Sequence, residues 1–211
     1  MCTRPPEETR ILEGVVTTLP TPDARSEQAN IAPMGPIVNP SITQLILRPF
    51  QTSTTYRNLK ATGQGVFHVT DDALLIARAA IGHIQPVHEV AIQPAPHVHG
   101  IVLSGACRYY EFRVVELDDR EPRTRIVAKV IHTGRLREFF GFNRAKHAVI
   151  EAAILATRVH LTGLQPVRDE LCKLQTLVDK TGGEAEQLAM NELRTYVNTY
   201  QPKPQHPNPE P

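Results

Sequence analysis

The stretch LRPFQTSTTYRNL, residues 47–59, decides how the rest of the chain is interpreted. It continues an apolar run that begins at Ile42, and Pro49 interrupts that run. Four consecutive hydroxyl residues follow at positions 52–55, ahead of a helical pattern that extends through Lys60. Proline ends a regular strand, and hydroxyl side chains favour helix starts. The stretch therefore predicts a strand, a hydroxyl-rich turn and a helix.

The hydroxyl-rich turn has two interpretations. The first backbone N–H groups of a helix lack internal partners and lie at the positive end of the helix dipole, which suits a phosphate group. Arg48 and Arg57 could add positive charge to such a site. Ser and Thr are also common helix caps with no ligand nearby. Both a phosphate site and a simple cap are therefore compatible with this turn.

The irregular stretch NIAPMGPIVN, residues 30–39, precedes this turn in the chain. Pro33 and Pro36 surround Gly35, so the stretch cannot be a regular central strand and is expected at a sheet edge. A flavin needs an anion site, an apolar slot and backbone groups at the polar edge of its ring. The two stretches together could supply all three. The alternative is an edge strand whose prolines only prevent aggregation.

Further β-strands are predicted from β-branched residues and alternating patterns. Gly14 lies inside the first of them, which indicates a bulge or a close backbone approach. A helix is expected over residues 73–81, opened by Asp71 and Asp72 and ended by Gly82. The segment 83–100 holds three prolines and is expected to be a loop. The strands cover residues 11–18, 42–48, 66–70, 107–117 and 124–133, and the last two form a hairpin.

From Asn143 onward the apolar spacing changes from two to about three and a half residues, which is typical of helices. Asn143 is a suitable N-cap, and Gly163 is expected to end the first helix. Further apolar stripes predict helices over residues 167–182 and 185–200. Residues 201–211 have a proline at nearly every second position and are expected to be a disordered tail.

Composition excludes several classes of protein. The chain has 211 residues and a formal net charge of +1, so no global field favours nucleic acid or an anionic membrane surface. Its three cysteines form no Cys-x-x-Cys motif, which fits a reducing compartment. No stretch reaches the roughly 20 apolar residues of a membrane-spanning helix, and no signal peptide is recognised. We therefore expect a cytoplasmic protein.

Motifs of common active sites are missing from the sequence. His83, His88, His97 and His99 lie in one segment, but their spacing matches no zinc pattern, so no metal site is expected. The sequence has no Gly-x-Ser-x-Gly elbow, which weakens a hydrolase interpretation. It also lacks the Gly-rich motifs of dinucleotide-binding proteins and ATPases.

Five segments resemble a poorly characterised family found in archaea and some bacteria: ILEGVVTT (11–18), NIAPMGP (30–36), LRPFQTSTTYRNL (47–59), GVFHVTDDALL (65–75) and GFNRAKHAVIEAAI (141–154). This family is similar in fold to the FMN-binding split β-barrels of flavin reductases. The resemblance implies a mainly β fold with α: a six-stranded Greek-key split β-barrel with flanking helices and a helical C-terminal subdomain. It also implies a homodimer with FMN near the subunit interface, and a link to pterin-dependent one-carbon metabolism.

The resemblance also assigns residues to the FMN site. The isoalloxazine ring is expected near the backbone of the irregular strand, and the ribityl phosphate near the hydroxyl-rich turn. The start of the helix at Asn143 is a further candidate, because two cations in a first helical turn oppose the helix dipole unless an anion lies there. The assigned residues are Asn30, Ile31, Ala32, Pro33, Met34 and Gly35 at the ring; Arg48, Thr52, Ser53, Thr54, Thr55 and Asn58 at the phosphate; and Asn143, Arg144 and Lys146 as the extension.

The sequence thus predicts an FMN-binding oxidoreductase or flavin carrier, with no catalytic side chain identified. The alternative is a non-redox binding or assembly protein that holds a pterin or another anionic ligand. The expected organisation is a loose N-terminus (1–10), a split-barrel domain (11–142), a helical subdomain (143–200) and a disordered tail (201–211). No nucleic-acid or membrane partner is expected.

Overall fold

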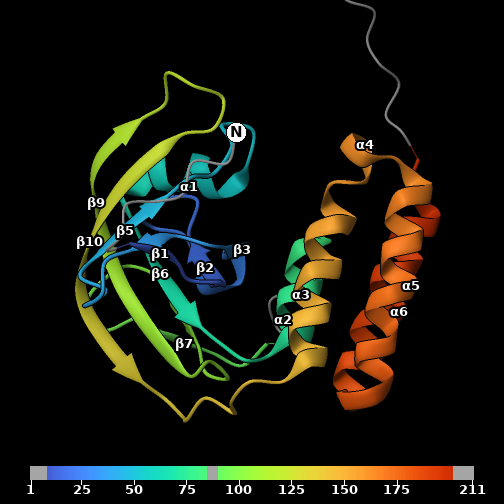
Figure 1. Ribbon diagram of the computed structural model, residues 1–211. Coiled ribbons are helices and arrows are strands. Elements are labelled where there is room, and N and C mark those ends of the chain that lie inside the picture. Colours follow the sequence, from blue (N-terminus) through green and yellow to red (C-terminus); the bar gives the residue numbers. More distant parts are fainter. Residues whose placement is uncertain (1–8, 85–89, 202–211) are drawn as a thin grey trace, which may run out of the picture.

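The computed structural model describes residues 9–84 and 90–201. A curled β-sheet forms one side of the molecule, and a group of helices stands beside it (Figure 1). The predictions for the loose N-terminus and the disordered tail fall almost entirely outside the described residues. Arg10 is an exception, since it already belongs to the first strand, β1.

The main sheet is an antiparallel half-barrel of the split-barrel type, as predicted. It contains eight strands where six were expected, because two predicted strands are each divided. The first divides around Leu12, and the irregular stretch divides at Gly35 and Pro36. In spatial order the strands are β1 (Arg10–Ile11), β4 (Ile37–Val38), β5 (Gln44–Leu47), β10 (Arg125–Arg135), β9 (Arg108–Asp118), β6 (Gln64–Val69), β2 (Gly14–Thr18) and β3 (Asn30–Met34).

Strand β3 is the end strand of this sheet, as its prolines predicted. It pairs with β2 in a register that sets Pro33 opposite Val15 and Met34 opposite Gly14. Proline has no N–H to donate, so an edge is where a strand tolerates it. One edge of β3 therefore has no strand partner within the described part of the chain.

The hairpin of β9 and β10 is the longest strand pair and agrees with the prediction. Two register shifts interrupt it, between Val127 and Ala128 and between Val130 and His132. Such bulges bend a strand and change the direction of nearby side chains. The second shift leaves Ile131 without a partner of its own and sets His132 opposite Glu111.

A small second sheet lies in the segment 83–100 and just beyond it, where the sequence predicted only a loop. Its strands, β7 (Ile92–Pro94) and β8 (Ile101–Leu103), have three residues each, which is too short for a recognisable alternation. Buried contacts fix β8 to the main sheet. The hydroxyl of Thr17 donates to the carbonyl of Ile101 at 2.7 Å, and the N–H of Leu103 donates to Nε2 of His68 at 3.1 Å.

Helices α1 (Thr54–Thr62) and α2 (Ala73–Ala80) begin at polar caps that accept backbone N–H groups. Gly63 ends α1 in the left-handed conformation, at φ 66°, which glycine adopts without steric cost. Asp72 caps α2, whereas Asp71 binds Arg137 and the N–H of Phe140 instead. Asp71 thereby holds the connection from β10 to the helices.

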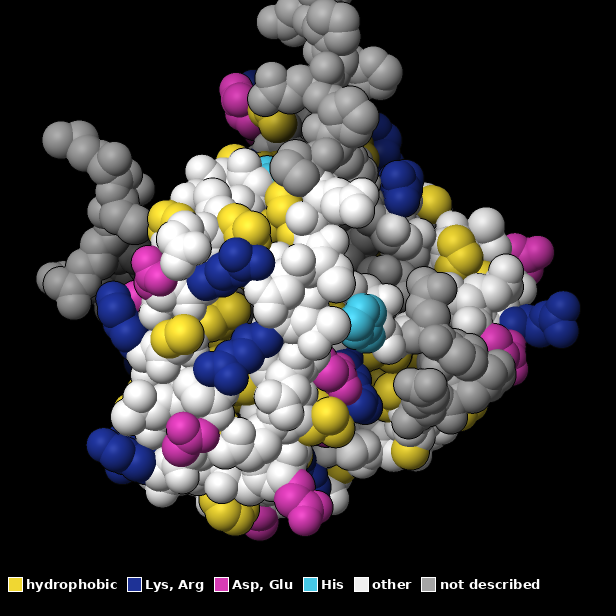
Figure 2. All heavy atoms as spheres, turned by 90° about the vertical axis from the view of Figure 1, so that its right-hand side faces the viewer, with side chains coloured by type: hydrophobic (Ala, Val, Ile, Leu, Met, Phe, Trp, Pro, Cys, Tyr) yellow, Lys and Arg dark blue, Asp and Glu magenta, His cyan; other side chains and the backbone are white. Residues whose placement is uncertain are grey.

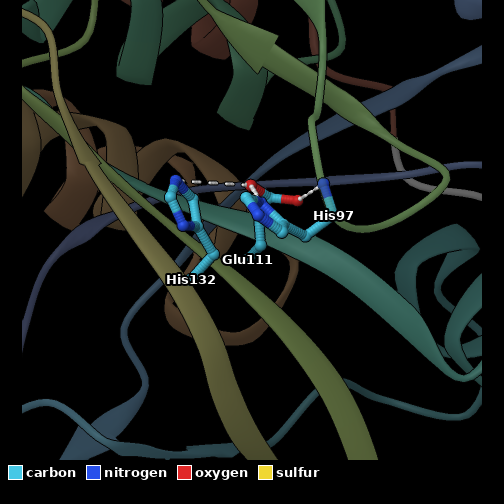
Figure 3. Close-up of side chains that lie close together, drawn as sticks. All are labelled: His97, Glu111 and His132. Carbon is cyan, nitrogen blue, oxygen red and sulfur yellow. Dashed lines mark hydrogen bonds and ion pairs between the residues drawn. The ribbon is translucent and has the colours of Figure 1, made fainter.

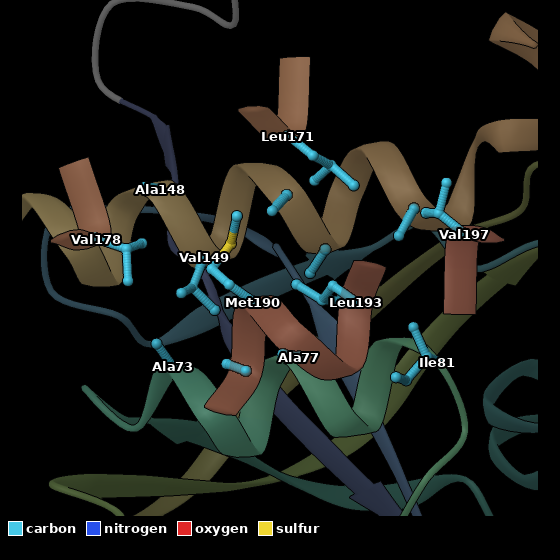
Figure 4. Close-up of a cluster of buried hydrophobic side chains, with 14 of the residues drawn as sticks. Ala73, Ala77, Ile81, Ala148, Val149, Leu171, Val178, Met190, Leu193 and Val197 are labelled. Atoms are coloured by element: carbon cyan, nitrogen blue, oxygen red, sulfur yellow. The ribbon is translucent and has the colours of Figure 1, made fainter. Parts of the chain in front are cut away.

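The C-terminal part is helical, as predicted, with α3 (Arg144–Thr157), α4 (Val159–Thr162), α5 (Leu164–Thr181) and α6 (Glu184–Thr199). The predicted continuous helix to Gly163 is wrong at one point, because α3 ends at Thr157 and the short α4 follows after Arg158. Helix α2 packs Ala73 and Ala77 into the same buried cluster as Met190 of α6 (Figure 4). The barrel segment and the helical segment of the sequence therefore share a core.

The surface carries both signs of charge. On the face where α5 and α6 lie, basic and acidic side chains are interspersed and no field of one sign dominates (Figure 2). This agrees with the net charge of +1. None of the described helices is both long and apolar enough to cross a membrane.

Candidate functional site: a cationic cavity at the edge of the barrel

The stretch at residues 47–59 folds as the strand, turn and helix that its pattern predicted. Strand β5 ends at Leu47, and α1 begins after the N-cap Ser53, whose hydroxyl accepts the N–H of Tyr56 at 3.2 Å. The N–H of Ser53 donates to the carbonyl of Phe50 at 2.9 Å, which closes the turn. Hydrogen bonds within the chain thus fix the turn.

The connection between β9 and β10 is joined to this turn by backbone hydrogen bonds. The N–H of Gln51 donates to the carbonyl of Pro122, and the N–H of Thr124 to that of Pro49, both at 3.0 Å. The Thr124 hydroxyl is a second donor to Pro49, at 2.8 Å. These bonds hold Arg123 beside the turn, although it is far away in the sequence.

A cavity of about 580 Å³ opens between β3, this turn, the start of α1 and the end of α3. Its volume falls in the range of about 300–1,000 Å³ that small-molecule sites occupy. The wall combines apolar groups with a few polar ones. The lining residues are Ile11, Glu13, Ala32, Pro33, Met34, Gly35, Arg48, Pro49, Phe50, Ser53, Thr55, Arg123, Ile154 and Arg158.

Three arginines give the cavity a positive potential. The Nε of Arg48 is buried and has no hydrogen-bond partner among the described residues. Burial lowers the pKa of Arg123, and the positive charges of Arg48 and Arg158 lower it further. A buried donor without a partner and repulsion between like charges are both costly. An anion in this cavity would offset the repulsion between the arginines.

Seven of the predicted site residues line this cavity: Ala32, Pro33, Met34, Gly35, Arg48, Ser53 and Thr55. They come from the irregular strand and from the hydroxyl-rich turn, which the sequence analysis had paired. Asn30 does not line it but donates to Oγ1 of Thr55 at 3.1 Å, so it orients a lining hydroxyl. Ile31 is buried in a hydrophobic cluster instead.

Three residues predicted at the phosphate lie outside the cavity. Thr52 and Thr54 are exposed, and the hydroxyl of Thr54 accepts from the guanidinium of Arg57 at 3.0 Å. Asn58 is buried and donates to the hydroxyl of Thr18 at 3.0 Å. Neighbouring residues on a helix differ in direction by about 100°, so one hydroxyl of the pair at positions 54 and 55 turns away.

The predicted extension at the start of α3 lies away from this cavity. Asn143 caps α3, and Lys146 forms an ion pair with Glu186 at 2.9 Å. Asn143 and Lys146 line a different, smaller cavity, while Arg144 is exposed. Lys146 is eight residues before Ile154, the lining residue on the same helix, which is about 12 Å along the axis.

The sequence analysis missed Phe50, Arg123 and Arg158 as lining residues. The guanidinium of Arg123 lies over the ring of Phe50, 5.7 Å from its centroid. Arg158 is the exposed C-cap residue of α3, and no local pattern marks it as a lining residue. Nothing near Arg123 in the sequence indicates its contact with the turn.

Glu13 is the single acidic residue in the described lining and lies at the Gly35 end of the cavity. Part of its side chain is exposed, yet partial burial raises the pKa of this carboxyl group, and the negative charge of Glu151 raises it further. The cavity thus has one cationic end and one end with a carboxyl group that protonates more readily than usual.

The curled antiparallel half-barrel with flanking helices is the split-barrel fold of FMN-binding, flavin reductase-like proteins. Within that class the chain belongs to the family described as "Protein of unknown function (DUF447)". Residues 12–137 match its N-terminal domain and residues 143–195 its second domain.

A solved structure of the same family is the FMN-bound protein MM1853 from Methanosarcina mazei. It is 25% identical, with a TM-score of 0.72, and the match covers 88% of this chain and 94% of that one. The flavoredoxin of Methanosarcina acetivorans is more distant, with 11% identity and a TM-score of 0.47; the match covers 64% of this chain and 75% of that one. The 2-nitrobenzoate 2-nitroreductase NbaA of Pseudomonas fluorescens is equally distant. It has 14% identity and a TM-score of 0.48, and the match covers 60% of this chain and 64% of that one. None of the curated proteins compared with the chain matches it.

Proposed function

We propose that this chain is a flavoprotein that binds FMN in the cationic cavity. The observation that carries the proposal is the set of three lining arginines described above, next to the lining hydroxyls of Ser53 and Thr55. The similar protein MM1853 is FMN-bound, which supports the same ligand class.

The phosphate group of FMN fits the arginine end of the cavity. A dianion pairs well with guanidinium groups, which donate through several N–H groups at once. Thr55 presents a hydroxyl held by Asn30, and it lies in the first turn of α1, where the helix dipole favours negative charge. Arg48, Arg123 and Thr55 are therefore the proposed phosphate ligands.

The isoalloxazine ring fits the opposite end, along β3. This strand has one edge free of strand partners in the described chain, so its backbone groups can meet the polar edge of a ring. A Cβ at Gly35 would lie 2.8 Å from Cγ2 of Ile11, so a larger residue would have to push the cavity wall. We propose residues 32–35 as the ring-binding segment.

A bound flavin supplies the redox chemistry, while the protein positions it and controls access. The proposed activity is that of an oxidoreductase or a flavin carrier. A link to pterin-dependent one-carbon metabolism and a homodimer remain predictions that rest on the family resemblance. Reduction of the FMN-loaded protein by nicotinamide donors, followed in the visible spectrum, separates the enzyme from the carrier.

The test of the FMN site is a titration of flavin fluorescence with the protein and its variants. Arg48→Ala should weaken FMN binding about 10- to 100-fold, because a hydrogen bond to a charged group contributes roughly 1.5–3 kcal/mol. Arg57→Ala is the matched control, since Arg57 lies in α1 and contacts the same turn but is outside the cavity lining. Equal FMN affinity of the two variants would show that the phosphate group binds elsewhere.

The two neighbouring threonines give a finer test. Thr55→Ala should weaken FMN binding severalfold, whereas Thr54→Ala should leave the affinity unchanged, because only Thr55 lines the cavity. If the chain instead is the non-redox binder of another anion, FMN will leave its melting temperature unchanged. A ligand that binds the native state alone must raise that temperature.

A further inference from the structure

A second group of ligating side chains lies outside the FMN cavity. His97 comes from the turn between β7 and β8, Glu111 from β9 and His132 from β10 (Figure 3). One atom of each, a ring nitrogen or a carboxylate oxygen, lies within 4.8 Å of the other two. The three residues are so far apart in sequence that no short motif could predict their meeting.

Glu111 is the fixed centre of this group. Its side chain is fully buried, and Oε2 accepts the backbone N–H groups of His97 at 2.7 Å and Val98 at 2.8 Å. Those two bonds hold the carboxylate in place and leave Oε1 toward the imidazoles, 3.3 Å from Nδ1 of His97 and 4.0 Å from Nε2 of His132. The orientation of this oxygen is therefore set by the backbone.

The bulge in β10 creates the third position. Without the register shift after Val130, the apolar Ile131 would lie opposite Glu111; with it, His132 does. Bulges are common next to functional sites because they change the direction of a side chain. The ring of Tyr109 lies next to His132, with the two ring centroids 5.9 Å apart. It occupies space that a Cβ at position 134 would take, so Gly134 makes room for it.

We propose that His97, Glu111 and His132 bind a divalent transition-metal ion of the Zn²⁺ type. Two imidazoles and one carboxylate are ligands that zinc accepts at about 2.0–2.2 Å, which in a tetrahedral site sets neighbouring ligand atoms about 3.4 Å apart. The 3.3 Å between Nδ1 of His97 and Oε1 of Glu111 already fits this value. The 4.0 Å between Nε2 of His132 and the same oxygen shortens to it with a small rotation of the His132 ring. This proposal departs from the expectation, drawn from sequence spacing, that the chain has no metal site.

The exposure of the histidines indicates what kind of site this is. The side chain of His97 is 50% exposed and that of His132 33%, whereas Glu111 is 0% exposed. The rings stack with centroids 4.0 Å apart, so they must separate slightly to hold an ion, and their exposed sides leave room for this. Three protein ligands on a solvent-open face leave the fourth position to water, as in zinc sites that stay open to a ligand.

The metal site lies on the other face of the sheet from the barrel core. Side chains alternate along β9, so Glu111 points away from Tyr110 and Phe112, which pack in the core cluster with Leu47. It faces the smaller cluster that contains Val98. A bound ion would fasten the turn after β7 to the β9 and β10 hairpin without contact with the FMN cavity.

The experiment is a titration of the full-length, chelator-treated protein with Zn²⁺, read as melting temperature, and with Co²⁺, read as visible absorption. The wild-type protein should gain melting temperature and develop Co²⁺ bands. His132→Ala should bind at least about 100-fold more weakly, because loss of a ligand exceeds the 10- to 100-fold effect of losing a group behind it. His97→Ala and Glu111→Gln should do the same.

The control variant is His160→Ala, which removes an exposed histidine of α4 and should leave metal affinity unchanged. His97 and His132 are partly exposed, so their alanine variants test the site even if Glu111→Gln does not fold. Absence of a Zn²⁺ effect and of Co²⁺ bands in the wild-type protein, or equal affinity in His132→Ala and His160→Ala, would overturn the proposal. The FMN affinity of His132→Ala should equal that of the wild type, so the two sites succeed or fail separately.

Discussion

Acidification below about pH 6.5 should destabilise this protein through His68. The ring of His68 is fully buried in β6. Its Nδ1 lies 3.2 Å from the carbonyl of Val15, and its Nε2 accepts the N–H of Leu103 at 3.1 Å. The ring is therefore neutral, with its proton on Nδ1. A second proton would have to bind Nε2, which already accepts the N–H of Leu103, so the folded protein disfavours the charged ring.

The size of the effect follows from the pKa of His68. Burial lowers this pKa from 6.5 to about 4 in the folded protein. Between these values the unfolded chain binds more protons, so the free energy of unfolding rises with pH and falls on acidification. At about 1.4 kcal/mol per pH unit, the full loss between pH 6.5 and pH 4 is about 3 kcal/mol. Above pH 6.5 this contribution is constant.

The assay is urea unfolding at several values between pH 7 and pH 4, followed by circular dichroism, since the chain has no tryptophan. His68→Gln lacks the titrating group and is the comparison protein. The wild type should lose about 3 kcal/mol more than the variant over this range. Asp71 does not interfere, because its pKa, lowered to about 2 chiefly by Arg137, shifts its loss of stability below pH 4. Parallel pH profiles of the two proteins would refute the reasoning.

Three further substitutions test the packing, each by urea unfolding against the wild type. Asp71→Asn should cost about 2 kcal/mol, because it breaks charge-assisted bonds to Arg137; an unchanged midpoint would mean the pair is not formed. Gly134→Ala should cost about 2 kcal/mol by forcing the ring of Tyr109 to move; tolerance without loss would place that ring elsewhere. Met190→Ala should cost about 2–5 kcal/mol, and a smaller loss would show that the helical core collapses onto the cavity.

Local patterns predicted the local structures well. The proline and hydroxyl residues at 49–55 gave the turn and its cap, and the change of period at Asn143 gave the helical half. The prolines of the irregular stretch gave the edge position of β3. Each of these features depends on residues within a few positions of one another. Local backbone geometry therefore suffices to predict them.

The parts that sequence could not give depend on contacts between distant segments. Arg123 reaches the cavity only because the hairpin connection bonds to the turn after β5. His132 meets Glu111 only because of a bulge that no residue in β10 announces. Likewise, Thr54 and Thr55 look equivalent in sequence, and only the rotation of α1 separates them. Both proposed sites depend on such placements and not on sequence motifs.

The cationic cavity also explains why a ligand should matter to the stability of this fold. Arg48, Arg123 and Arg158 repel one another, and a buried Nε without a partner adds a desolvation cost. The backbone bonds between the turn and the hairpin connection hold Arg48 and Arg123 together against that repulsion. An anion bound between these arginines would reduce their repulsion and so stabilise the folded protein. The stabilisation by FMN should therefore fall as salt rises, because ions screen the arginines and weaken their pairing with phosphate.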